Sequence, residues 1–98
     1  MINFALTITT KADKDEAEIY KYISEEFGVN YANEFRKKLF NLFKLLLKQP
    51  FIGRPAKNNP TLRVYVFNNH NKVVYKLSEN SISIIRILHT KTNLSSKY

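Results

Sequence analysis

Residues 2–8 alternate apolar with polar or small side chains, which is the period of a strand that buries one face. Further along, the apolar residues recur every three or four positions, and this spacing predicts a helix over residues 11–27. Thr10 and Asp13 have the spacing of a capping box at its start, and Gly28 is the residue type that closes many helices. The side chains expected to face the core are Ile2, Phe4, Leu6 and Ile8 in the strand and Ala12, Ile19, Ile23 and Phe27 in the helix.

A second helix is predicted directly after the first, with Asn30 as its N-cap and its end before Pro50. Its core stripe is expected to comprise Ala32, Phe35, Leu39, Leu42, Phe43 and Leu46. So short a link between two helices predicts an antiparallel helical hairpin. From Leu39 to Leu47 seven of nine residues are apolar, more than one core-facing stripe can use. Either another segment of this chain or a partner protein is therefore expected to cover the surplus.

The second half of the chain changes to a period of two. Residues 49–61 contain all three prolines and one of the two glycines, which is typical of an ordered surface loop. β-Branched and aromatic residues then form three runs divided by turn compositions, at residues 62–67, 72–77 and 82–88. These runs predict an antiparallel meander. The order strand, helix, helix, strand, strand, strand predicts an α+β fold in one domain over residues 1–98, with a sheet packed against an N-terminal helical hairpin and its other face open to solvent or a ligand.

Charge separates the two halves of the chain. The 98 residues include 16 Lys and Arg but 8 Asp and Glu, a net charge of +8. Glu79 is the only acid after residue 49, opposite Arg54, Lys57, Arg63, Lys72, Lys76, Arg86, Lys91 and Lys97. This asymmetry predicts attraction for a polyanion or an acidic protein. The chain has no Cys and no apolar run long enough for a signal peptide or a membrane span, so we expect a cytoplasmic protein.

Few residues support metal or nucleophilic catalysis. Two His, no Cys and a single carboxylate in the second half do not readily make a metal site, so no metal and no cofactor is expected. Arginine grips phosphate or carboxylate with two bonds. Arg63, at the start of a strand, is expected to be exposed and to bind, whereas Arg86, within an apolar strand, is expected to pair with a carboxylate of the helices. His89 at the exit of that strand could transfer protons near neutral pH.

Five segments carry a resemblance to a known family: Ile19-Tyr20-x-Tyr22-Ile23, Phe27-Gly28, Pro50-x-x-Gly53-Arg54-Pro55 followed by Leu62-Arg63, Val73-Val74-Tyr75, and Ile84-Ile85-Arg86-Ile87-Leu88-His89. In this order they resemble the RelE/ParE superfamily of bacterial toxins, and its ParE-like branch in particular. The resemblance covers nearly the whole chain. It implies a growth-inhibiting, plasmid-stabilising toxin of a type II toxin–antitoxin pair. Its partner would be a cognate antitoxin whose acidic segment wraps the toxin in a hetero-oligomer.

The resemblance implies two modes of action. ParE-like members inhibit DNA gyrase, whereas RelE-like members cut messenger RNA in the ribosome. Aligned on Val73-Val74-Tyr75, this sequence has Phe67 and Thr92 where a RelE-type nuclease has arginines. We therefore expect a toxin that acts by binding gyrase, with RNA cleavage as the alternative. In that alternative the catalytic candidates are His89, Arg63, Lys72 and Lys91.

The residues expected to bind the target or the antitoxin are Arg54, Arg63, Arg86, His89, Leu45 and Leu47. An acidic antitoxin segment is expected to cross the cationic sheet face, while an apolar helix packs near Leu45 and Leu47. Gyrase, or the ribosome with its messenger RNA, would be the further partner, and no membrane contact is expected. A third interpretation is a basic interaction domain that has lost its toxicity.

Overall fold

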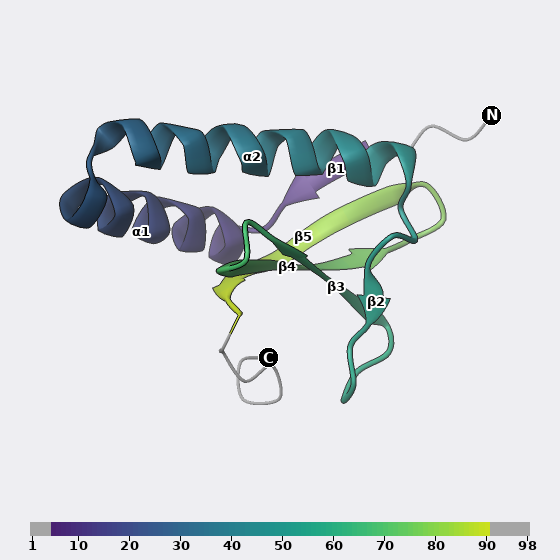
Figure 1. The fold of residues 1–98 in the computed structure, drawn as a ribbon. Helices are drawn as coiled ribbons and strands as arrows, with labels where there is room; N and C mark the ends of the chain where they lie inside the picture. Colours follow the sequence, from purple (N-terminus) through teal and green to yellow (C-terminus); the bar gives the residue numbers. More distant parts are fainter. Residues whose placement is uncertain (1–4, 91–98) are drawn as a thin grey trace.

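Two helices and five strands make up residues 5–90, the part of the chain that the computed structural model describes (Figure 1). The elements are β1 (Ala5–Ile8), α1 (Thr10–Phe27), α2 (Val29–Lys48), β2 (Arg54–Pro55), β3 (Leu62–Phe67), β4 (Asn71–Leu77) and β5 (Ser81–His89). The strands form one sheet in the order β1-β5-β4-β3-β2. The α1–α2 hairpin covers one face of this sheet and extends past its edge (Figure 1). The predicted α+β fold is confirmed.

The pairing of the strands is mixed. The meander β3-β4-β5 is antiparallel, as predicted. β1 runs parallel to β5, with Ala5 opposite Ser81. The expectation that residues 49–61 are loop throughout is wrong at two positions, because β2 pairs with β3 through Arg54 opposite Val64. Two paired residues are too few to give the sequence a recognisable period.

The core between the helices and the sheet combines four residues of the stripe predicted for the second helix with six residues of the sheet and Ala12 of α1. Phe35 of α2 stacks on Phe67 of β3, with ring centroids 5.9 Å apart. The buried members of this core are Ala12, Phe35, Leu39, Leu42, Leu46, Phe67, Val73, Tyr75, Ile82, Ile84 and Ile87. A second, smaller cluster contains Ala56, Leu62, Val64, Val74 and Leu88. Strand alternation places this second cluster on the face that the helices do not cover.

Both helix starts differ from the prediction. Thr9, not the residue after it, caps α1, and its hydroxyl oxygen accepts a hydrogen bond from the Ala12 N–H at 3.1 Å. Gly28 caps α2, and no side chain donates or accepts a capping bond there, so the assignment of Asn30 as the cap is wrong. The cause is the backbone of Gly28, whose φ of 103° lets a single residue end one helix and begin the next.

Two apolar residues that were expected in the core are exposed. Ile8 ends β1 at the edge of the sheet, where no further strand of the described chain covers its outer side. Phe27 lies at the end of α1, on the part of the hairpin that extends past the sheet (Figure 1). Within residues 5–90, neither helix is long and apolar enough to cross a membrane.

Candidate functional site

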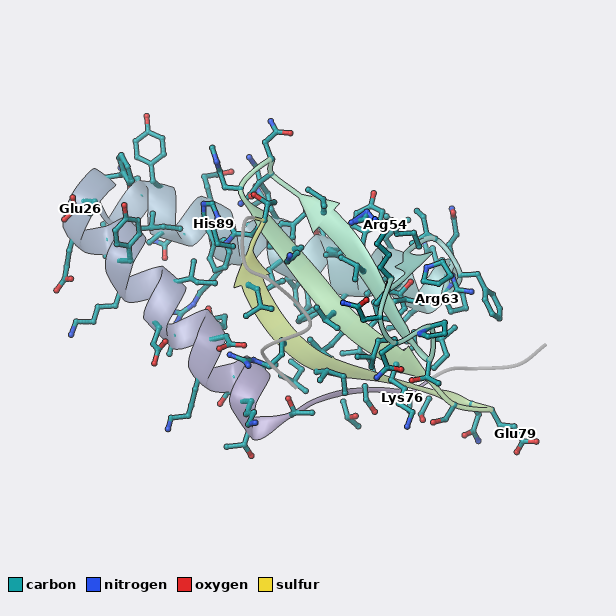
Figure 2. The ribbon with its side chains drawn as sticks, turned by 90° about the horizontal axis from the view of Figure 1, so that it is seen from below. Glu26, Arg54, Arg63, Lys76, Glu79 and His89 are labelled. Carbon is teal, nitrogen blue, oxygen red and sulfur yellow. The ribbon has the colours of Figure 1, made fainter. Side chains whose placement is uncertain are left out.

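The sheet face opposite the helices carries cations around the smaller apolar cluster. Cross-strand register places Arg54, Lys72 and Lys76 on this face. Figure 2 views the molecule from below and shows Arg54, Arg63 and Lys76 on the β2 side of the sheet, with His89 at the far end. Arg54 and Lys76 are exposed. The residues of the smaller apolar cluster are themselves buried, so the exposed cations Arg54 and Lys76 are what this face offers to an anionic partner.

Lys72 differs from the other two cations because it is only 6% exposed. Its Nζ donates a hydrogen bond to the Thr90 carbonyl oxygen at 3.2 Å. Burial lowers the pKa of Lys72, and the nearby positive charge of Arg54 lowers it further. Lys72 is therefore a partly desolvated cation on the open face, near the β3–β4 turn.

Arg86 forms the internal ion pair that the sequence predicted. Its Nε donates to Asp15 Oδ2 at 2.7 Å and its Nη2 donates to Asp15 Oδ1 at 2.9 Å. The same Asp15 carboxylate accepts the Ile87 N–H at 3.0 Å, so it links α1 to β5. The two side chains are 16% and 11% exposed. This geometry gives Arg86 a structural role, although it was also among the residues expected to bind the target or the antitoxin.

Arg63 does not lie free on the surface, and the expectation of exposure is wrong. It is half-buried, and its Nη1 donates to the Phe51 carbonyl oxygen at 3.2 Å and also to the Gly53 carbonyl oxygen. Its guanidinium carbon lies 5.0 Å from the centroid of the Phe51 ring. The reason is β2, which brings the preceding loop against the start of β3. Arg63 therefore holds that loop in place.

The catalytic candidates are not brought together. Lys72 lies on the open face of the sheet. His89, opposite Asn71 on the neighbouring strand, points to the other face and lines a groove against the helices. Arg63 pairs with Tyr75, near the other end of β4. Lys91 lies outside the described residues. Three of the four candidates thus occupy three separate places on the sheet.

A groove that the sequence did not predict lies between the helical hairpin and the β3–β4 turn. Its volume is about 580 Å³. Exposed aromatic side chains of the hairpin line it on one side, and His70 and His89 line it on the other. The aromatic members are Tyr22, Phe27, Tyr31 and Phe35, and the charged members are Glu18, Glu34 and Lys38. The available signal was the surplus of aromatic residues on both sides of Gly28.

The two leucines expected to anchor a partner helix differ in their exposure. Leu45 is half-buried and packs against the main core, so it serves the fold. Leu47 is 38% exposed. The apolar surplus of α2 is therefore covered in part by the chain itself and in part left open at Leu47 and Phe40.

Solved structures of other proteins share the fold of this chain. Over 90% of this chain and 97% of the other, the fold matches a chain of the chromosomal ParDE TA system from P. aeruginosa, with 22% identity and a TM-score of 0.78. A chain of the toxin–antitoxin complex RelBE2 from Mycobacterium tuberculosis matches with 18% identity and a TM-score of 0.61, covering 94% of this chain and 97% of that one. A conserved hypothetical protein from Helicobacter pylori matches with 18% identity and a TM-score of 0.60, covering 92% and 96%. At these identities the likeness shows the fold.

The fold is thus the one that chains of the ParDE and RelBE2 structures also have. Residues 6–94 match the family model of the ParE toxin of the type II toxin–antitoxin system parDE, and the chain belongs to this family. No curated protein sequence matches the chain. The predicted resemblance to the ParE-like branch is confirmed, and the chain is a toxin of the type II toxin–antitoxin class.

Proposed function

We propose that this toxin acts by binding its target, that the target is DNA gyrase, and that a cognate antitoxin prevents the encounter. The observation that carries the proposal is the separation of the catalytic candidates. Metal-independent RNA cleavage needs a base, an acid and charge-stabilising cations around one phosphate. Here Arg63 supports a loop, and Lys72 and His89 lie on opposite sides of the sheet.

Phe67 supports the same proposal. It occupies the aligned position of a catalytic arginine in RelE-type nucleases, but its ring is buried and stacks on Phe35. A side chain in this place packs the core and cannot reach a phosphate on the open face. Binding is the activity that remains for the exposed cations Arg54 and Lys76.

The antitoxin is proposed to use both the charge and the groove. An acidic segment fits the open sheet face, where Arg54, Lys72 and Lys76 lie around the smaller apolar cluster. An amphipathic helix fits the aromatic groove beside the hairpin. The sequence suggested the surface near Leu45 and Leu47 for that helix, but Leu45 packs against the core and only Leu47 is exposed, so the groove is proposed in its place.

A supercoiling assay tests the target. Purified toxin is expected to inhibit gyrase in a dose-dependent manner, and addition of the antitoxin, sought as the product of the adjacent reading frame, is expected to restore supercoiling. Phe40→Ala serves as a matched surface variant, because Phe40 lies on α2 away from the proposed contacts. Full gyrase activity at a large molar excess of folded toxin contradicts the proposal.

A RelE-type nuclease is the second candidate, favoured by one observation. Lys72 has a lowered pKa and lies close to Arg54, and such a pair of cations suits a phosphate in the open face. Primer extension on messenger RNA after induction of the toxin decides between the two. Cuts at fixed positions within codons support the nuclease, and their absence while growth stops supports action by binding.

A further inference from the structure

The connection between α2 and β2 lies at the corner of the molecule where α2 ends (Figure 1), and its apolar side chains are exposed. Phe51 is 69% exposed, Ile52 is 37% exposed, and Leu47 in the last turn of α2 is 38% exposed. We call these three residues the loop patch. The aromatic groove beside the hairpin is lined by other residues. The loop patch is therefore a separate surface from that groove.

The backbone that carries the patch is held by two side chains from the sheet. The Tyr75 hydroxyl donates to the Pro50 carbonyl oxygen at 2.9 Å and accepts the Gly53 N–H at 2.8 Å. Arg63 donates to the carbonyl oxygens of Phe51 and Gly53. Tyr75 is fully buried, so this support comes from the core itself.

This support fixes a loop whose apolar side chains contribute little to the core. The hydrogen bonds to Tyr75 account for the order of the loop backbone, but the Phe51 ring, 69% exposed, gains little from burial in the folded chain alone. A binding surface does gain from this order, because a loop that is ordered beforehand loses less conformational entropy when a partner binds. The Arg63 guanidinium near the Phe51 ring also brings together two residue types that are enriched at protein interfaces.

We propose that the loop patch contacts the target of this toxin, and that the target offers there an apolar pocket bordered by carboxylates. The inference rests on the proposed action by binding. A pre-ordered projecting patch suits a pocket on a folded protein, whereas a wrapping acidic segment needs a groove. The carboxylates follow from charge, since Lys48 and Arg54 flank the loop and no acidic residue occurs between Glu34 and Glu79.

The test compares Phe51→Ala with Phe40→Ala, since Phe40 is a similarly exposed phenylalanine, at 60%, on another part of the surface. Each variant is expressed without antitoxin, and growth arrest is measured by colony counts. Phe51→Ala is expected to raise colony survival at least about tenfold, as for an interface hot spot. The toxin concentration needed to inhibit growth is expected to rise by the same factor. Phe40→Ala is expected to behave as the parent chain. Melting temperatures and antitoxin affinity are measured for all three proteins.

Each outcome supports or overturns the proposed target contact at the loop patch. Reduced toxicity of Phe51→Ala, with unchanged melting temperature and antitoxin affinity, supports a target contact at the loop patch. Equal arrest by the parent chain and Phe51→Ala overturns this inference alone. A parallel loss of antitoxin affinity also overturns it, because the patch would then contact the antitoxin. A parent chain that causes no arrest overturns the proposed function and this inference with it.

Discussion

The side chain of Tyr75 is buried in the core, and its hydroxyl forms hydrogen bonds with the backbone of the surface loop. Its hydroxyl lies between the Pro50 carbonyl and the Gly53 N–H, and a Cβ on Gly53 would lie 2.6 Å from that oxygen. Glycine is therefore required at position 53 by the close approach of the ring. Burial also raises the pKa of Tyr75, so the hydroxyl keeps the proton that it donates to the Pro50 carbonyl oxygen.

Tyr75→Phe tests this contact. It leaves the Gly53 N–H and the Pro50 carbonyl oxygen without their partner in a buried place, and such a loss costs about 1–3 kcal/mol. We expect the free energy of unfolding, measured with urea, to fall by about that amount. Tyr22→Phe is the control, because its ring is 59% exposed and water can replace its contacts. Equal stability of Tyr75→Phe and the parent chain would contradict the assignment.

Lys72 gives a pH-dependent prediction. Its pKa in the folded chain lies below the ordinary value of 10.5, because the buried site disfavours the charged form. The unfolded chain therefore binds more protons between the lowered pKa and 10.5, and the contribution of Lys72 to stability rises with pH across that window. Below the window the charged, buried amine lowers the free energy of unfolding by a constant amount.

Lys72→Met removes this titration. We expect the free energy of unfolding of the variant, relative to the parent chain, to be highest near neutral pH and to decline as the pH rises toward 10.5. Urea unfolding at a series of pH values measures the difference. Lys76→Met, at an exposed position on the same strand, is the matched control. A difference for Lys72→Met that does not change with pH would show that its amine is not desolvated.

At the level of elements, the helical hairpin depends on one residue. Gly28 has φ 103° and ψ 158°, a conformation that is essentially restricted to glycine. A Cβ there would meet no neighbour within 4 Å, so backbone strain is the whole effect of a substitution. We expect Gly28→Ala to lower the free energy of unfolding by about 1–3 kcal/mol. Gly28→Asn is expected to be as harmful, because this conformation lies outside the left-handed region that asparagine tolerates. Rescue by asparagine in urea unfolding would contradict this account.

The helices and the meander were predictable because their periods are local. The stripe from Ala32 to Leu46 repeats at three and four and packs on the sheet as expected. The partner of β1 was not predictable, since a strand of alternating residues does not encode which strand it pairs with. Exposure at the ends of elements, as at Phe27, depends on where the sheet stops. That boundary is a property of the assembled fold.

The candidate site was predicted less well for the same reason. The ion pair of Arg86 could be inferred, because a cation within an apolar strand needs a carboxylate. The position of Arg63 could not be inferred, because its partners are backbone carbonyls of a loop that β2 brings close. The aromatic groove was also missed, since it forms only where the hairpin passes the β3–β4 turn.

For the molecule as a whole, the excess of positive charge was expected to serve an acidic partner. The structure divides these cations into two groups. Arg36 and Arg86 pair with Glu16 and Asp15 of α1 and stabilise the fold. Arg54 and Lys76 are exposed on the open sheet face. The electrostatic prediction therefore does not rest on Arg36 or Arg86, and Arg54 and Lys76 are the exposed cations of the open sheet face that test it.

Arg54→Gln combined with Lys76→Gln tests whether the position of these charges matters beyond their number. Two exposed ion pairs at about 0.5–1 kcal/mol each predict an antitoxin affinity at least about fivefold weaker, with a shallower dependence on salt. The matched control is Lys21→Gln combined with Lys37→Gln, which removes the same charge from exposed positions on α1 and α2. Isothermal titration at several salt concentrations measures both pairs. If net charge alone attracts the antitoxin, the two variants lose affinity equally, and the open sheet face has no special role. If only the Arg54 and Lys76 variant loses antitoxin affinity, the antitoxin contacts these two charges directly. Its acidic segment must then cross the sheet.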